Sequence, residues 1–334
     1  MPMFLNWSRT DTRVCLTNLV KEGHTLQFLL FLPTNSMILM QRLSIFLFVI
    51  LFFQLKIAAA DGFDDSLHLK LPGNQLYASW SSDGRQLVYQ SDANGNWDIY
   101  LYSLETQKVS ALTHSPVDEQ HPIWVPGKNA IVFERGKGRH VHLVVFRLSD
   151  GVEKRLINRS IAGKEASFTP SRHLVAFSGW DDITESWQLF TYDFVYDNLN
   201  QLTHEDGNIG FPVFDSKGKT IAFLISRDGQ KPMLAMCNWY GEKLVRMANL
   251  SPGKVSWTPS GWRFYGIDHP GMGRRSVCSW RKDGSAKNVL YVGRKGLCCP
   301  ALSPDGLWWV ISKENDQGDF DLWLYRLENT THQQ

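Results

Sequence analysis

The residues best suited to chemistry are His121 and the two carboxylates just before it, Asp118 and Glu119. A histidine beside carboxylates can bind a metal ion or transfer protons near neutral pH. A catalytic site would need several such groups converging from different parts of the chain. The equivalent positions of the internal repeat described below hold only mixed polar residues: Gln75, Lys164, Glu165, Asn208, Lys254 and Lys295. We therefore interpret this set as a solvated polar rim and predict no catalytic and no metal-ligating residue.

The segment 92–98 (DANGNWD) is a second candidate for metal binding, because oxygen-bearing side chains stand at four alternate positions. The arrangement is superficially that of a calcium loop, but no bidentate glutamate follows it. Asn, Gly and Asp also favour tight turns between strands. We therefore predict a hairpin turn here and a matching one at 316–321 (DQGDFD), and no cofactor.

Four cysteines lie beyond residue 60: Cys237, Cys278, Cys298 and Cys299. They form no C-x-x-C pair and no spacing with histidine that suits zinc. In an oxidising compartment Cys278 could pair with Cys298 or Cys299. Free buried thiols are the alternative, and the sequence leaves both open.

Common enzymatic motifs are missing from the sequence. It contains no G-x-S-x-G nucleophile elbow, no phosphate-binding P-loop and no H-E-x-x-H metal motif. Residues 61–334 carry 30 basic and 31 acidic groups, without a basic stripe. A near-neutral body of this kind lacks the electrostatic footprint of a nucleic-acid-binding protein.

Residues 1–60 have the features of a leader. The apolar run 43–55 (LSIFLFVILFFQL) follows Arg42, and three alanines at 58–60 supply a small-residue cleavage site. The run is shorter than the about 20 residues that a membrane-spanning helix needs. We expect a cleaved signal peptide over 37–60, a mature start near Asp61, no stable membrane span, and a periplasmic or secreted protein. Residues 1–36 precede an ordinary signal sequence, so we expect translation to start at Met37 or Met40.

An internal repeat of about 44 residues organises the rest of the chain and positions the polar residues discussed above. A bulky residue ends a short strand and is followed by a turn of Ser, Pro, Asp or Gly. These anchor residues are Trp80, Trp124, Phe168, Phe214, Trp257 and Leu302, at intervals of 44, 44, 46, 43 and 45. Nine residues after each of the first four anchors stands an aromatic residue that ends a second strand: Tyr89, Phe133, Phe177 and Phe223.

Each of the first five repeats contains four short strands with apolar residues on both faces. Such a sheet cannot stand alone, and radial stacking buries both faces. We therefore predict an all-β, six-bladed β-propeller of four-stranded antiparallel blades over residues 61–334. The residues two before each anchor are small or rigid, as expected for strands that line a crowded channel: Ala78, Pro122, Ala166, Pro212, Val255 and Pro300. The last repeat lacks a fourth strand, which we expect segment 66–72 (SLHLKLP) to supply, closing the ring.

Two strings, YASWSSDGRQLVYQSDANGNWDIYLY and CPALSPDGLWWVISKENDQGDFDLWLYRL, resemble the repeat of TolB-like propellers. The resemblance covers about residues 66–328. It implies an exported propeller whose channel mouth and loops bind another protein. The family's namesake also has an α/β domain before the propeller, for which we expect no room here.

We predict a non-enzymatic, monomeric scaffold that binds a protein or peptide of the cell envelope. The loops that join fourth to first strands and second to third strands form the expected binding face, since rigid blades hold variable loops. The residues expected to make contact are Asp118, Glu119, His121, Glu165, Asn208, Lys254 and Lys295, with Trp97 and Trp180 as aromatic anchors. The alternative is a metal-assisted lyase or hydrolase that acts on saccharides in the channel.

Overall fold

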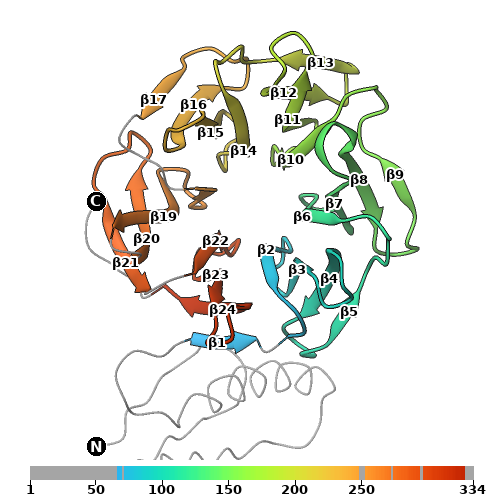
Figure 1. Ribbon diagram of the computed structural model, residues 1–334, viewed down its shortest axis with the longest axis vertical. Helices are drawn as coiled ribbons and strands as arrows, with labels where there is room; N and C mark the ends of the chain where they lie inside the picture. Colours follow the sequence, from blue (N-terminus) through green and yellow to red (C-terminus); the bar gives the residue numbers. More distant parts are fainter. Residues whose placement is uncertain (1–65, 70, 248–252, 272–273, 294–295, 328–334) are drawn as a thin grey trace, which may run out of the picture. The chain divides into compact units, whose positions relative to one another are not determined.

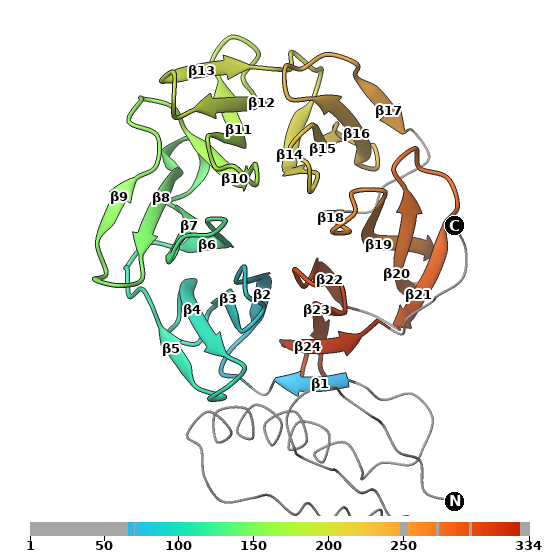
Figure 2. The ribbon, with the colours of Figure 1, turned by 180° about the vertical axis from the view of Figure 1, so that it is seen from behind.

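Six small antiparallel sheets of four strands stand around a central axis (Figures 1 and 2). This computed structural model describes residues 66–69, 71–247, 253–271, 274–293 and 296–327, which belong to a unit spanning Asp65–Gln334. The predicted six-bladed propeller is confirmed. The predicted leader, residues 1–60, lies outside the described residues.

The strands follow the repeat closely. The first blade holds β2 (Gln75–Trp80), β3 (Gln86–Ser91), β4 (Asp98–Ser103) and β5 (Val109–Ala111). The second holds β6 (Glu119–Trp124), β7 (Ala130–Arg135), β8 (His142–Arg147) and β9 (Glu153–Arg155), and the third β10 (Gly163–Phe168), β11 (Leu174–Asp181), β12 (Ser186–Asp193) and β13 (Asn198–Gln201). The fourth holds β14 (Asn208–Phe214), β15 (Thr220–Ser226), β16 (Met233–Asn238) and β17 (Val245–Met247). The fifth holds β18 (Ser256–Trp257), β19 (Arg263–Gly271), β20 (Arg274–Arg281) and β21 (Asn288–Gly293), and the sixth β22 (Leu297–Leu302), β23 (Trp308–Glu314) and β24 (Phe320–Arg326).

Helix is nearly absent from the described residues. The single short segment η1 (Gly138–His140) is a 3₁₀ turn between β7 and β8. Within the described ranges, no helix is long and apolar enough to cross a membrane.

The sixth blade takes its fourth strand from the other end of the chain. Strand β1 (Ser66–Leu69) lies antiparallel to β24, with Ser66 opposite Tyr325 and Leu69 opposite Leu322. Leu69 is 3% exposed and packs in the core between the sixth and first blades, whereas Leu67 on the other face is 49% exposed. The segment that the sequence assigns to the last blade therefore occupies that place.

An apolar cluster fills every interface between neighbouring blades. The aromatic residues nine positions after the first four anchors are among the largest fully buried side chains of this core, with exposures of 0 to 1% for Tyr89, Phe133, Phe177 and Phe223. Each cluster combines side chains of two adjacent sheets, which is the stacking that the two apolar faces of each repeat require.

A polar clamp, repeated at three interfaces, also joins neighbouring blades. The residue six positions before the anchor accepts a hydrogen bond from a backbone N–H of the preceding blade. Asn74 accepts from Phe320 at 2.9 Å, Asp118 from Trp97 at 3.3 Å and Asn208 from Trp187 at 3.0 Å. Each clamp crosses between sheets that no strand pairing connects.

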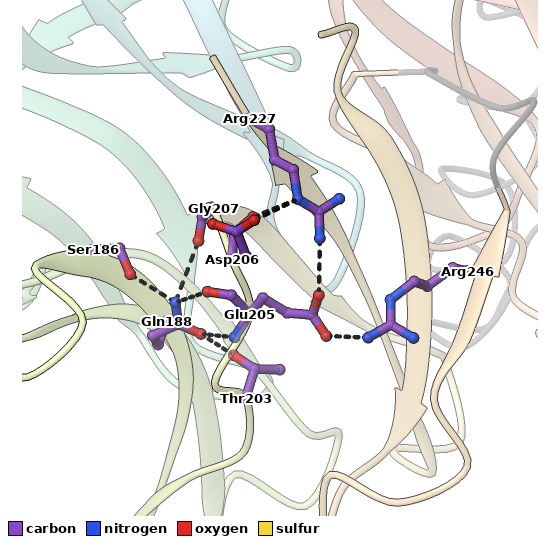
Figure 3. Close-up of polar contacts among 8 residues, drawn as sticks. All are labelled: Ser186, Gln188, Thr203, Glu205, Asp206, Gly207, Arg227 and Arg246. Atoms are coloured by element: carbon purple, nitrogen blue, oxygen red, sulfur yellow. Dashed lines mark hydrogen bonds and ion pairs between the residues drawn. The ribbon is translucent and has the colours of Figure 1, made fainter.

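A polar network of eight residues lies at the junction of the third and fourth blades (Figure 3). The buried Gln188 donates to Ser186 Oγ and to the carbonyls of Glu205 and Gly207, and accepts from the Thr203 hydroxyl and the Glu205 N–H at 2.9 Å each. The Glu205 carboxylate in turn receives the guanidinium groups of Arg227 and Arg246 from the fourth blade. One amide therefore fixes the loop that presents Glu205 to the next blade.

The segments weighed as metal or disulfide sites have other roles. Asp92 accepts hydrogen bonds from the backbone and side-chain nitrogens of Asn74 at 2.7 and 2.8 Å, within the predicted hairpin turn. The four described cysteines are free thiols. Burial raises the pKa of Cys237 to about 12 and that of Cys278 to about 11.

Loss of the Leu69 side chain should weaken the sixth blade. Leu69→Ala leaves a cavity in a full core, so we expect unfolding in urea to show a loss of about 2–4 kcal/mol. Leu67→Ala, in the same strand but half exposed, is the matched control and should cost less than about 1 kcal/mol. Equal stabilities of the two variants would contradict a packing role for β1.

Replacing Gln188 should loosen the junction in Figure 3. Gln188→Ala leaves the buried partners of the amide without hydrogen bonds. We therefore expect the free energy of unfolding, measured by chemical denaturation, to fall by about 2–3 kcal/mol. Gln230→Ala, at an exposed turn, should be nearly neutral. A Gln188→Ala protein as stable as the Gln230→Ala protein would show that water replaces the network at no cost.

Candidate functional site

A backbone bulge recurs in the innermost strand of five blades. The pairing of first and second strands shifts register between Leu76 and Ser79 in the first blade, and at the equivalent places in the second, third, fourth and sixth. One residue of each bulge has a positive φ of 51 to 57°: Tyr77, His121, Glu165, Phe211 and Cys299. A left-handed conformation costs an ordinary residue about 1–2 kcal/mol. Bulges are often found where a side chain must be re-aimed, and here they occur at the same depth around the axis.

The bulge residues meet at the axis. Lys254 occupies the equivalent position of the fifth blade, in a bend before β18. We call the six residues the axial cluster: Tyr77, His121, Glu165, Phe211, Lys254 and Cys299. The ring centroids of Tyr77 and His121 are 4.1 Å apart, and both rings lie within about 6 Å of Phe211, at 6.0 and 5.7 Å. Lys254 Nζ lies 5.8 Å from the Tyr77 ring centroid. Side chains from opposite blades therefore contact one another in mid-channel.

Two buried carboxylates hold this cluster in place. Glu134 Oε1 lies 2.8 Å from His121 Nδ1 and accepts the Glu165 N–H at 2.6 Å. Glu165 Oε2 accepts hydrogen bonds from the Ser178 hydroxyl at 2.9 Å and from the Phe211 N–H at 2.8 Å. The carboxylates thus connect the second, third and fourth blades and satisfy backbone groups that the bulges expose.

The electrostatics of the cluster shift several pKa values. Burial alone would lower the pKa of His121, but the adjacent Glu134 carboxylate outweighs it and raises that pKa above the ordinary 6.5. Burial lowers the pKa of Lys254. Burial would raise the pKa of the Cys299 thiol, yet contact with Cys298 and the nearby Lys254 and His121 cations bring it below its usual range. The cluster therefore mixes charges of both signs in a partly dry channel.

A cavity of about 280 Å³ lies on one side of the axial cluster. His121, Glu165, Phe211 and Lys254 form its floor, and its walls combine three serines, Ser79, Ser167 and Ser256, with a larger number of apolar residues: Ala78, Trp80, Ile123, Trp124, Ala166, Phe168, Pro212, Val213, Val255, Pro300, Ala301 and Leu302. Five of the six small or rigid residues predicted for the channel line it. Pro126 and Pro304, in turns between first and second strands, mark its outer end. The cavity therefore extends toward the face opposite the loops that the sequence suggested.

The predicted contact residues separate into three groups. His121, Glu165 and Lys254 come together at the cavity floor. Asp118 and Asn208 serve in the clamps between blades, and Asp118 also pairs with Lys137 at 2.7 Å. The remaining four lie apart from the cavity or outside the described residues.

Glu119, the first of these four, is fully buried and ion-paired with Arg135. The Trp97 carbonyl accepts the Glu119 N–H at 2.7 Å. Trp180 lies under the Arg139 guanidinium at 4.4 Å. Lys295 is outside the described residues. None of Glu119, Trp97 and Trp180 lines the cavity.

Three members of the axial cluster, Tyr77, Phe211 and Cys299, were missed from the sequence, as was the supporting Glu134. The sequence does contain a signal for the three cluster residues: each stands one residue before the small or rigid residue of its channel strand. That position holds Tyr, His, Glu, Phe, Lys and Cys in the six repeats, whereas the following one is always small or rigid.

A family model described as the TolB beta propeller domain matches residues 51–292, more than two thirds of the chain. The chain belongs to this family. A curated relative, the Tol-Pal system protein TolB of Francisella tularensis subsp. mediasiatica, is 29% identical over 107 residues, 31% of this chain. The match covers 25% of the relative's length, so the chain spans only about a quarter of the curated relatives it matches.

Solved structures share the fold at low identity. TolB from Acinetobacter baumannii superimposes with a TM-score of 0.57 and 15% identity, covering 75% of this chain and 63% of that one. An oligogalacturonate lyase in complex with manganese gives the same TM-score and identity, covering 79% of this chain and 93% of that one. Identities this low establish the propeller fold and nothing about activity.

Metal ligands do not converge in the described part of the chain: no three His, Cys, Asp or Glu side chains there could hold an ion together. His121 instead contacts a single carboxylate, Glu134, whose oxygen also accepts a backbone N–H. Glu134 therefore holds His121 and the backbone of Glu165 in position.

The His121–Glu134 pair should make stability depend on pH. The folded-state pKa of His121 is raised, so the pair stabilises the protein below the unfolded value of about 6.5, and this contribution is lost as pH rises through the folded-state pKa. Glu134→Gln keeps an acceptor for the Glu165 N–H but removes the charge. We expect its destabilisation in urea to be larger at pH 5.5 than at pH 8.5, and its His121 pKa by NMR to fall.

Glu185→Gln, at an exposed turn, provides the matched charge removal. It should show no comparable pH dependence. A Glu134→Gln defect of the same size at both pH values would mean that the carboxylate acts only as a hydrogen-bond acceptor.

Proposed function

We propose that the protein is an exported, non-enzymatic propeller that binds a protein or peptide partner of the cell envelope, with part of that partner seated in the channel cavity. The observation that carries the proposal is a cavity with rigid apolar walls and a floor of fixed charges. Membership of the TolB propeller family and the likeness to a protein named for the Tol-Pal system support an envelope partner.

The cavity suits a short, extended piece of chain. Its volume of about 280 Å³ accommodates a few side chains rather than a folded element. Apolar walls favour an apolar or aromatic segment, because its burial there removes surface from water. At the floor, His121, Glu165 and Lys254 can orient a polar group at the tip of the segment. Such a mixture of apolar walls with few convergent polar groups is typical of binding pockets.

Exposed aromatic residues gather on the face toward which the cavity extends. Turns joining first to second and third to fourth strands lie at the same edge of an antiparallel meander. Tyr196, Tyr240 and Trp262 stand in such turns and are 80, 61 and 68% exposed. Exposed aromatic residues are enriched at protein interfaces. We therefore place the partner on this face.

A metal-assisted saccharide lyase or hydrolase is the alternative use of the channel. It would need His or carboxylate ligands from several blades around an ion. Among the described residues no three such ligands lie together, and Glu134 and Glu165 already accept hydrogen bonds from backbone N–H groups, which favours binding over metal chemistry. A stoichiometric metal ion in the purified protein would reverse this preference.

Cross-linking in the native envelope tests the proposal. A partner captured by the wild-type protein should be captured at least about tenfold less by Phe211→Ala at the cavity floor and by Trp262→Ala in the exposed turn before β19, since aromatic contacts dominate interface energies. Ile183→Ala is the control, because this side chain is 92% exposed at the opposite edge of its blade. Equal capture by all three folded variants would contradict the proposal.

A further inference from the structure

Three serine side chains line the channel cavity at one equivalent position of alternate blades. Ser79, Ser167 and Ser256 each stand one residue before the anchor of their blade, on β2, β10 and β18 (Figure 2). The same position is apolar in the other three blades, where it holds Ile123, Val213 and Ala301. Polar and apolar residues therefore alternate around the axis.

The three serine hydroxyls keep their own protons available. Each oxygen accepts the backbone N–H of the next anchor, at distances of 3.0 to 3.4 Å. A hydroxyl that accepts one hydrogen bond can still donate another. Among the described residues, none of the three hydroxyls donates to a protein acceptor. The cavity wall therefore offers three hydrogen-bond donors to a ligand.

Lys254 supplies a cation at the floor of the same cavity. Its ammonium group forms no hydrogen bond and no ion pair with any described residue, and Nζ lies 5.8 Å from the centroid of the Tyr77 ring. Burial lowers the pKa of Lys254, and the charges of Glu134, Glu165 and Cys299 only partly offset this effect. A charge that is removed from water without a partner is unfavourable. Lys254 thus lacks a counter-ion.

The two carboxylates near Lys254 are matched by other cations. Glu134 Oε1 lies 2.8 Å from His121 Nδ1. Glu165 Oε1 lies 3.8 Å from Lys164 Nζ, and its other oxygen accepts two hydrogen bonds. When His121 is protonated, these five side chains carry three positive and two negative charges. The floor therefore favours an anionic ligand over a cationic one.

We propose that the cavity binds the C-terminal carboxylate of its peptide partner, with Lys254 as the counter-ion and the hydroxyls of Ser79, Ser167 and Ser256 as donors to the carboxylate and to the last peptide carbonyl. The inference rests on the proposed function, because it names the part of the partner that occupies the channel. Hydrogen bonds from an ammonium group to a carboxylate are stronger than those between neutral groups. The apolar part of the wall would pack against the last side chain of the partner.

The shape of the cavity selects a chain end over an internal segment. Tyr77 and Phe211, from opposite blades, have ring centroids 6.0 Å apart, so the axial cluster closes the inner end of the cavity. An internal segment would have to enter and leave through the outer end as two adjacent strands. The volume of about 280 Å³ lies just below the range of about 300–1,000 Å³ for ligand pockets, and one chain end fills it. An N-terminus would bring a second ammonium group beside Lys254, and like charges repel.

A pair of peptides provides the test. The probes are fluorescein-labelled Gly-Ser-Gly-Val-Phe with a free C-terminal carboxylate and the same peptide with a C-terminal amide, each titrated with the purified protein by fluorescence anisotropy. We expect the free acid to bind saturably and at least about tenfold more tightly than the amide, since hydrogen bonds to charged groups are the stronger ones.

Lys254→Met keeps a side chain of similar length but removes the charge. It should weaken binding of the free acid and leave binding of the amide unchanged, so that the difference between the two peptides disappears. Because Lys254 has no partner in the free protein, we expect this variant to be at least as stable to urea as the wild type. Lys219→Met, at an exposed position in the turn between β14 and β15, is the matched control and should keep the difference.

Two further probes identify the source of the carboxylate. One is the amidated peptide Gly-Ser-Glu-Gly-Phe, which carries its carboxylate on an internal side chain, and the other is 3-phenylpropionate, a free small acid. Both should bind more weakly than the free-acid peptide.

Four results would overturn the inference. They are absence of saturable binding of the free acid, equal binding of the acid and the amide, an unchanged difference between them in Lys254→Met, and equal or tighter binding of either further probe. If the acid and the amide bind equally and Phe211→Ala weakens both, the channel site stands and only the assignment of the carboxylate fails. If Phe211→Ala weakens neither peptide, the channel site itself fails.

Discussion

A four-stranded sheet of about 44 residues with two apolar faces cannot persist alone, and this constraint governs the whole molecule. Each of the six interfaces between blades is filled by a cluster drawn from both neighbours. The polar clamps at Asn74, Asp118 and Asn208 add hydrogen bonds across three of these interfaces. The contacts between neighbouring sheets therefore stabilise each blade.

Radial stacking brings the innermost strands close to one axis. Five of these strands contain a bulge at that depth. At that depth a positive φ turns five side chains inward, although each such residue adopts an unfavourable conformation. Aromatic contacts and the buried carboxylates of Glu134 and Glu165 offset this cost. Local strain that the surroundings compensate is characteristic of places where a protein holds side chains for a purpose.

The sequence predicted the elements that depend on periodic patterns. The spacing of Trp80 and its equivalents identified the blades, and within segment 66–72 residues Ser66–Leu69 pair with the last strand, as predicted. Only three of the six residues of the axial cluster were predicted, because a bulge interrupts the two-residue alternation of a strand. No local sequence pattern indicates where a bulge occurs. Glu134 was missed for a related reason: it lies in a second strand, and only the three-dimensional fold brings it to His121. Asp118 and Asn208 look like exposed loop residues in the sequence, but their hydrogen bonds reach the preceding blade.

The four-residue strand β1 has one further consequence. The first five blades are each formed from continuous chain, whereas the sixth depends on a strand held to β24 by hydrogen bonds and by the packing of Leu69. Because β1 joins the blade from the other end of the chain, it is the strand that a second molecule can replace. At high concentration, β1 of one molecule could insert beside β24 of another, so domain swapping would begin at this blade and leave the other five intact.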